Sequence, residues 1–294
     1  MINMLNNKLF ASIVYKIRGD LVPLPTTIIQ LNKMDINTVT AAEIGKIIEM
    51  DQALVSRVLR LANSAYYGAA QRISTISYAI VCLGFNKVKS LALTATSQKF
   101  LKTKLEKYGM EQNALFEHSL AVAIGSRMLS EKTGLGRPEE AYIMGLLHDV
   151  GKLIINMHEG NEMTEVWNLY KTGGMKFFQA EEQIMGFNHG DVGAEVSRKW
   201  NFPEELCQVI ENHHNPEKVQ GKNIGAFIVH IADGIAKTLE VGSGIVTQQD
   251  SKLEMEGIFK ERNLKELNLT KDAILDIRSN LLDRLKTVLN ELKE

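Results

Sequence analysis

The stretch AYIMGLLHDVGKLIINM, residues 141–157, guides the interpretation of the whole 294-residue chain. It is apolar on nearly every helical face apart from His148, Asp149 and Lys152, which predicts a helix buried on most sides. Because an unpaired buried carboxylate is unstable, Asp149 is expected to have a cationic or metal partner. His148 and Asp149 can reach one ion or straddle two. Lys152, one turn beyond His148, can face the same cavity and contact a phosphate.

Further histidines and an aspartate lie on apolar helix faces elsewhere in the chain. His213 and His214 follow apolar residues at steps of three and four, and His118, His189 and Asp233 are likewise in phase with apolar neighbours. A single inward histidine is more often a hydrogen-bonded core residue than a ligand. Five histidines and two aspartates together are costly to bury unless they converge. Imidazole and carboxylate ligands suit Fe, Mn, Zn or Ni, so we expect a divalent transition metal, as one ion or two.

The two remaining histidines are weaker candidates. His158, beside Glu159 and Gly160, is expected to lie at a helix end. His230 has two open interpretations, packing within its helix or supporting a metal ligand from behind.

The dominant period of the sequence is helical, with no convincing run of alternating strand residues. Residues 40–43 form the pattern of a capping box, and Asp51 and Thr75 are expected to cap later helices. The helix after Thr75 is expected to stop at Gly84, with Asn86 opening the next. The sequence therefore predicts an all-α protein.

Three parts are expected along the chain: an N-terminal helical lobe over residues 1–105, a helical lobe with the His/Asp cluster over 106–245, and C-terminal helices over 246–294. An apolar stripe near the end predicts either a terminal helix packed on the core or a dimer-forming helix, so a homodimer stays open. Its members are Ile274, Ile277, Leu281, Leu285 and Leu289.

Composition excludes several classes of protein. A formal net charge of -1 gives no electrostatic argument for nucleic acid or a membrane surface. The first twenty residues are too short and too interrupted for a spanning helix and lack a signal-peptide cleavage site. Cys82 and Cys207 form neither a disulfide framework nor a zinc motif, so a cytoplasmic protein is expected. A nucleic-acid-binding interpretation, disfavoured by the neutral charge, would use scattered bases of the N-terminal lobe: Arg57, Arg60, Arg72, Lys87 and Lys89.

The segment LLHDVGK, residues 146–152, resembles the HD signature of metal-dependent phosphohydrolases, and the other candidate ligands match the positions of that family in order. The order is most similar to HD-GYP proteins, which hydrolyse cyclic dinucleotides at a site of two or three metals. The resemblance implies that one metal is held by His118, His148, Asp149 and Asp233. It implies that a second is held by Asp149, His189, His213 and His214, with Lys152 facing the phosphate. Metal ions bridged by Asp149 would activate water for attack on a phosphoester.

The N-terminal lobe resembles a different branch of the HD superfamily. After His214 the sequence reads NPEKVQGKN, without a Gly-Tyr-Pro motif. Residues 21–25 (LVPLP), 42–68 (ending LANSAYYG) and 73–93 are similar to the HDOD domain, an output domain of bacterial signalling proteins. The similarity implies a regulatory domain that acts through ligand or protein contacts, with signalling proteins and a nucleotide or second messenger as partners. The enzymatic alternative is a phosphohydrolase on a nucleotide or other phosphoester, with Asp149 and Lys152 as catalytic residues.

The segment LANSAYYG has two open interpretations. Asn63, Ser64 and Tyr66 could line a ligand groove between the lobes, or Asn63 and Gly68 could simply end a helix. Tyr66 and Tyr67 are expected to pack rather than to form a stacking platform.

Overall fold

The computed structural model of the chain describes residues 8–16, 26–34, 39–68, 71–219, 223–242 and 254–293. In these ranges the chain is helical, with one isolated β-bridge between Leu105 and Met110 and no strands. The all-α prediction is confirmed. The LVPLP segment of residues 21–25 lies outside the described ranges. No helix among the described residues is long and apolar enough to span a membrane.

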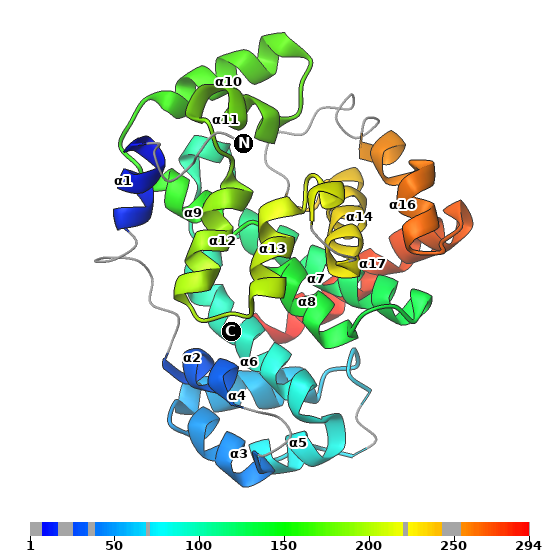
Figure 1. Cartoon of the computed structure of the whole chain (residues 1–294). Helices are drawn as coiled ribbons and strands as arrows, with labels where there is room; N and C mark the ends of the chain where they lie inside the picture. The colour runs from blue at the N-terminus through cyan, green and yellow to red at the C-terminus, as the bar shows by residue number, and fades with distance from the viewer. Residues whose placement is uncertain are drawn as a thin grey trace.

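The N-terminal helices gather at one end of the molecule, at the bottom of Figure 1. They are α2 (Thr26–Lys33), α3 (Ala41–Glu49), α4 (Gln52–Ala62), α5 (Ile76–Leu83) and the long α6 (Phe85–Leu101). The predicted caps are present: Thr40 and Glu43 form a capping box, and the side chains of Asp51 and Thr75 accept hydrogen bonds from backbone amides at 3.0 and 3.1 Å. Each cap satisfies an amide that the helix itself leaves free.

The start of α6 differs from the prediction. Gly84, with φ of +84°, ends α5 and directly precedes α6, so the helix begins at Phe85 and no side chain caps it. The prediction that Asn86 opens this helix was therefore wrong. The positive φ at Gly84 turns the chain within one residue, which leaves no place for a capping residue between the two helices.

The second group of helices surrounds α7 and is joined to the first by α6, which contacts α4 and α5 as well as α7 and α8. Its helices are α7 (Ala114–Thr133), α8 (Pro138–Leu147), α9 (Gly151–Asn156), α10 (Glu162–Gly173), α11 (Phe177–Met185), α12 (His189–Lys199), α13 (Glu204–Asn212) and α14 (Ile224–Thr238), with short 3-10 helices η2 (Glu106–Tyr108) and η3 (Pro216–Lys218). Helix α7 packs most extensively on α8 and α14.

The stretch of residues 141–157 is buried as predicted, but it forms two helices instead of one. The chain tightens between α8 and α9, where the amides of Val150, Lys152 and Leu153 donate to carbonyls three residues earlier. Gly151 then packs directly on the backbone of His189, where any side chain would overlap the carbonyl oxygen. The turn and the glycine together hold the HDVGK segment against the start of α12.

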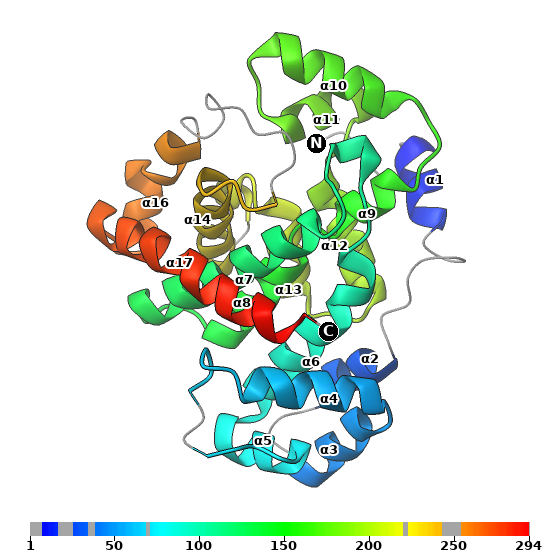
Figure 2. The ribbon, with the colours of Figure 1, turned by 180° about the vertical axis from the view of Figure 1, so that it is seen from behind.

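The C-terminal helices pack on the same group, as Figure 2 shows: α17 (Lys271–Glu291) lies across α7, and α16 (Glu261–Glu266) lies beside α14. The apolar stripe of α17 packs on the core within the chain, with Val288 buried where Leu289 is only half-buried. Helix α1 (Lys8–Lys16) packs against α12, away from α2 to α5. The predicted division into residues 1–105, 106–245 and 246–294 remains a prediction.

Candidate metal centre

The seven predicted ligands lie at one place, where five helices of the second group meet. His118 lies in α7, His148 ends α8, His189 begins α12, His213 and His214 follow α13, and Asp233 lies in α14, with Asp149 in the turn before α9. All are buried except His214, which is half-buried. Helices distant in sequence therefore bring these side chains together.

Asp149 lies in the middle of the cluster and faces two groups of histidines with its two oxygens. Its Oδ2 atom is 3.3 Å from Nε2 of His148 and 3.5 Å from Nε2 of His118. Its Oδ1 atom is 3.1 Å from Nε2 of His189 and 3.9 Å from Nε2 of His213. One fully buried carboxylate thus connects two sets of donors.

The first set is completed by Asp233. Its Oδ1 atom lies 3.1 Å from Nε2 of His118 and 3.7 Å from Nε2 of His148. We call the donors His118, His148, Asp233 Oδ1 and Asp149 Oδ2 the first subsite.

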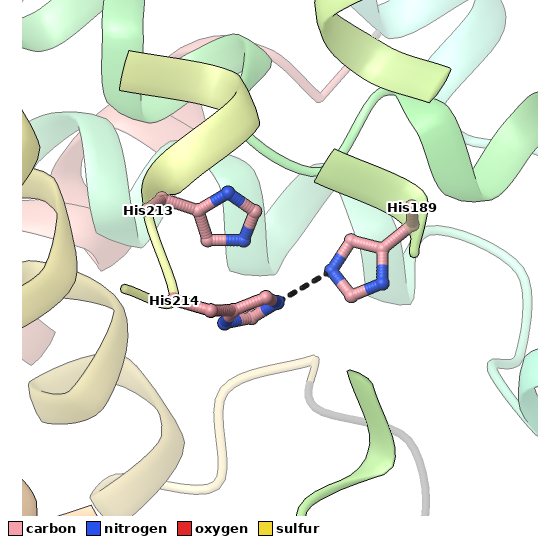
Figure 3. A group of neighbouring side chains, drawn as sticks. All are labelled: His189, His213 and His214. Atoms are coloured by element: carbon pink, nitrogen blue, oxygen red, sulfur yellow. Dashed lines mark hydrogen bonds between the residues drawn. The ribbon is translucent and has the colours of Figure 1, made fainter. Parts of the chain in front are cut away.

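The second set consists of three histidines, whose rings converge in Figure 3. The donor atoms of His189, His213 and His214 all lie within 4.8 Å of one another, and the Nε2 atoms of His189 and His214 are 2.8 Å apart. We call these three histidines with Asp149 Oδ1 the second subsite.

Four of the imidazole rings are held from behind through Nδ1. This atom lies 2.7 Å from the Gly145 carbonyl in His148, 2.6 Å from the Ile210 carbonyl in His213, and 3.1 Å from the Val241 carbonyl in His118. In His189 it lies 2.6 Å from a Glu181 carboxylate oxygen. Because a carbonyl oxygen can only accept, Nδ1 donates and the Nε2 lone pair of the neutral ring points into the cluster.

Several of these inward atoms lack hydrogen-bond partners among the described residues: Nε2 of His148, Nε2 of His213 and Oδ1 of Asp149. Buried acceptors that face one another are unstable without a cation or a proton between them. Two donors at about 2.1 Å from one metal ion, separated by 90–109°, lie roughly 3.0–3.4 Å apart. The spacings to Asp149 and Asp233, from 3.1 to 3.9 Å, are close to this range, so the residues fit a divalent metal.

Two lysines compensate the buried carboxylates. Nζ of Lys152 is 2.7 Å from Asp149 Oδ2, and Nζ of Lys237 is 2.6 Å from Asp233 Oδ2. Burial alone would raise the pKa of each carboxyl, but the neighbouring positive charges, His148 and Lys152 for Asp149 and Lys237 for Asp233, lower both well below the usual range. Both carboxylates are therefore charged at neutral pH, as metal ligation requires.

The histidines of the two subsites differ in their protonation. Burial lowers the pKa of His213 and of His214 well below the usual value, so both rings are neutral at pH 7. Burial also opposes the charged form of His148, but Asp149 and Asp233 raise its pKa to about 9. Burial lowers the pKa of His118, whereas Glu181 and Asp149 raise the pKa of His189 despite its burial. Each subsite thus contains one histidine with a raised pKa, and a metal at the first would have to displace a proton from His148.

Comparisons with known proteins agree with this architecture. The family model of the HDOD domain matches residues 21–216. The chain belongs to the HDOD domain family. It is similar to the crystal structure of an HDOD domain protein of unknown function from Geobacter sulfurreducens, with 27% identity and a TM-score of 0.79, covering 96% of this chain and 97% of the other. A provisionally assigned phosphohydrolase from Shewanella amazonensis, 21% identical with a TM-score of 0.69 over 96% and 98% of the chains, shares the fold.

Curated relatives match only parts of their own length. An uncharacterized protein of Treponema pallidum is 25% identical over 210 residues, which cover 71% of this chain and 40% of that protein. A Ribonuclease Y of Mycoplasma mycoides is 31% identical over 166 residues, 55% of this chain and 32% of that enzyme. The HDOD chain thus spans well under half of either relative.

Three residues beside the cluster were not predicted from the sequence. Glu181 is fully buried in α11, accepts from the ring and the amide of His189, and accepts the Tyr108 hydroxyl hydrogen bond at 2.6 Å. Lys237 stands one turn after Asp233, a spacing visible in the sequence. For Glu181 and Tyr108 the sequence holds no such signal, because α11 and η2 meet the centre only through the tertiary fold.

The other singled-out histidines have different surroundings. Nδ1 of His230 lies 2.8 Å from the carbonyl oxygen of His213, so its ring contacts the backbone of a candidate ligand. His158 follows α9 and pairs with Glu162 at 3.2 Å. His158 is not among the clustered residues.

The LANSAYYG segment of the HDOD chain ends α4 and packs against α7. Helix α4 ends at Ala62 with Asn63 as its C-cap. The hydroxyls of Tyr66 and Tyr67 both accept hydrogen bonds from Arg127 at 3.2 Å. The two tyrosines therefore pack in the structure, as expected, and Ser64 is buried.

Proposed function

We propose that this HDOD chain is a regulatory domain of bacterial signal transduction whose His/Asp centre binds divalent transition metal. In this proposal it works in the cytoplasm through contacts with signalling proteins or with a nucleotide or second messenger. The observation that carries the proposal is the position of Asp149, whose two oxygens face two separate sets of inward imidazole nitrogens. If the cluster bound no cation, its buried acceptor atoms would face one another without a partner.

The proposed ligands are those of the two subsites. One ion would be held by His118, His148, Asp149 and Asp233, and a second by Asp149, His189, His213 and His214. The mixed imidazole and carboxylate set suits Fe, Mn, Zn or Ni. Glu181 would orient His189 and raise its strength as a ligand, as carboxylates behind metal-bound histidines do.

A second candidate function is a metal-dependent phosphohydrolase acting on a nucleotide or other phosphoester. It is favoured by Lys152, whose ammonium group lies beside Asp149 and whose side chain is 13% exposed, and by the similarity to Ribonuclease Y. When bound, the metal would supply a Lewis acid and an activated water. Lys152 would bind the phosphate, and Asp149 would hold its charge through the reaction because Lys152 and His148 keep its pKa low.

Metal analysis tests the shared premise of both candidates. The protein is purified without oxygen, loaded with Fe or Mn, dialysed and analysed for metal per chain. We expect one to two ions per chain, with at least tenfold less in Asp149→Ala. A wild-type protein that retains no transition metal would overturn the proposal.

Turnover separates the two candidates once metal is bound. The loaded protein is offered cyclic dinucleotides, nucleotides and a generic aryl phosphodiester. Metal without hydrolysis of any of them supports the regulatory function. Hydrolysis that is lost in Lys152→Ala, with metal retained, supports the phosphohydrolase.

A further inference from the structure

A hollow with both polar and apolar residues lies apart from the His/Asp centre. It has a volume of about 730 Å³ and is lined by α4, by residues 71–74 and by Glu291 at the end of α17. Figure 2 shows the C-terminal end of α17 above α4. None of its lining residues belongs to the two metal subsites. The hollow is therefore a separate candidate site.

One wall is a single face of α4. Ser56, Leu59, Arg60 and Asn63 are three, four and seven residues apart, so they share one side of the helix. Nη1 of Arg60 donates to the Lys293 carbonyl at 3.2 Å, which ties the end of the chain to α4. Arg60 forms no other hydrogen bond or ion pair with the described residues, so its remaining N–H groups can bind a ligand.

The opposite wall is fixed by Asn63. Its amide nitrogen donates to the carbonyls of Leu59 and Ile73 at 2.7 and 2.8 Å, and its oxygen accepts from the Ile73 amide at 2.7 Å. Ile73 is itself buried. This two-way pairing holds residues 71–74 against α4, so the hollow is formed before any ligand arrives, which reduces the entropic cost of binding. Asn63 of the LANSAYYG segment therefore fixes residues 71–74 beside α4, a contact that the sequence did not predict.

The chemistry of the hollow favours an anion. Arg60 and Arg72 both line it, and neither forms an ion pair with any carboxylate in the described part of the chain. The hydroxyls of Ser56 and Ser74 add donors, against one carboxylate at Glu291. Guanidinium groups bind phosphate through paired hydrogen bonds.

The size of the hollow and its apolar residues favour a ligand larger than a simple ion. Sites for small molecules have volumes of roughly 300–1,000 Å³, and this hollow falls in that range. Leu59 and Ile73 provide apolar surface beside the two arginines. We infer that the hollow binds a phosphate-bearing small molecule of nucleotide size, with the phosphate between Arg60 and Arg72.

Calorimetric titration of the full chain with AMP, inorganic pyrophosphate and adenosine tests the inference. AMP and pyrophosphate are expected to bind, and adenosine at least tenfold more weakly, because it lacks the phosphate. Arg72→Gln is expected to weaken AMP binding at least tenfold. Arg72 is exposed, so this variant should fold normally. Arg57→Gln, the same charge change on α4 outside the hollow, is the matched control and should change binding less than twofold.

Four outcomes would overturn the inference. The first is that neither AMP nor pyrophosphate binds at about 1 mM. The second is that Arg72→Gln has no more effect than Arg57→Gln. The third is that binding persists in Arg72→Gln but vanishes in Asp149→Ala, which would assign the phosphate to the metal centre. The fourth is that a single-stranded oligonucleotide binds and every arginine variant weakens it equally, which would indicate a nucleic-acid surface.

Discussion

The buried polar side chains around Arg127 and those of the His/Asp centre are built into two different kinds of cluster. Around Arg127, most donors have acceptors: its guanidinium pairs with Glu139 at 2.6 Å, donates to Tyr66 and Tyr67, and lies 4.1 Å over the ring of Tyr142, while its Nε atom has no hydrogen-bond partner among the described residues. In the His/Asp centre, imidazole nitrogens and carboxylate oxygens face one another, and Nε2 of His148, Nε2 of His213 and Oδ1 of Asp149 have no hydrogen-bond partner among the described residues.

This difference is what we expect between a cluster that stabilises the fold and the proposed metal-binding cluster. The charge of Arg127 is matched within the fold, so the cluster can join the end of α4 to α7 and α8 without any ligand. In the His/Asp centre, Nδ1 of His148 and of His213 is held by a backbone carbonyl, but Nε2 of each ring has no hydrogen-bond partner among the described residues. We therefore expect substitutions around Arg127 to reduce the stability of the fold, and substitutions in the His/Asp centre to reduce metal binding. The predictions below test that division.

The largest effect is expected for Asp149→Ala. Both subsites lose their shared carboxylate, so metal per chain should fall at least tenfold after dialysis, measured by elemental analysis. His158→Ala, which changes a histidine outside the cluster, should retain the wild-type metal content. Equal metal in wild type and Asp149→Ala would contradict the assignment of the centre.

Arg127→Met should mainly affect the free energy of unfolding. It leaves Glu139 largely buried without its cationic partner, and removing one member of such a pair costs about 3–5 kcal/mol. Urea denaturation of the metal-free protein measures the loss. The double variant Arg127→Met with Glu139→Gln should recover part of it, because no charge is then left unpaired.

The metal content of folded Arg127→Met should equal that of the wild type. If this variant instead lost metal without losing stability, the division between the two clusters would be wrong.

Glu181→Gln should have an intermediate effect confined to the second subsite. The amide keeps the shape but loses the charge behind His189, and such changes weaken metal affinity by about 10–100-fold. Competition with a chelator measures the affinity of each ion. Glu182→Gln, its neighbour that contacts Asn188 instead, is the matched control. An equal loss in both variants would argue against orientation of His189 by Glu181.

The smallest effect concerns the thiols and tests how tightly α13, which leads to His213, is packed. Burial raises the pKa of Cys207 to about 11, whereas Cys82 is exposed. Because the thiolate is the reactive form, only about one Cys207 in a thousand is reactive at pH 8. A disulfide reagent should therefore label one thiol per native chain quickly and the second only after unfolding. Two fast thiols would show that α13 opens readily.

Local signals in the sequence predicted the helices well where a cap or a period was enough. Thr40 with Glu43, Asp51, and Thr75 each cap a helix as expected, because a cap depends only on residues three or four apart. The start of α6 and the break after His148 were missed. Both depend on backbone conformation at Gly84 and in the HDVGK turn, which the apolar pattern does not specify.

The linear sequence was enough to select the candidate ligands: polar residues on apolar helix faces indicated five histidines and two aspartates, and their order indicated the family. Only the tertiary structure decided how they are arranged. Three contacts join residues that are distant in the sequence or lie in separate helices: Asp149 with His189, Glu181 with His189, and Arg127 with Glu139. Such contacts depend on how helices pack, and helical periodicity fixes the face of a helix but not its neighbour.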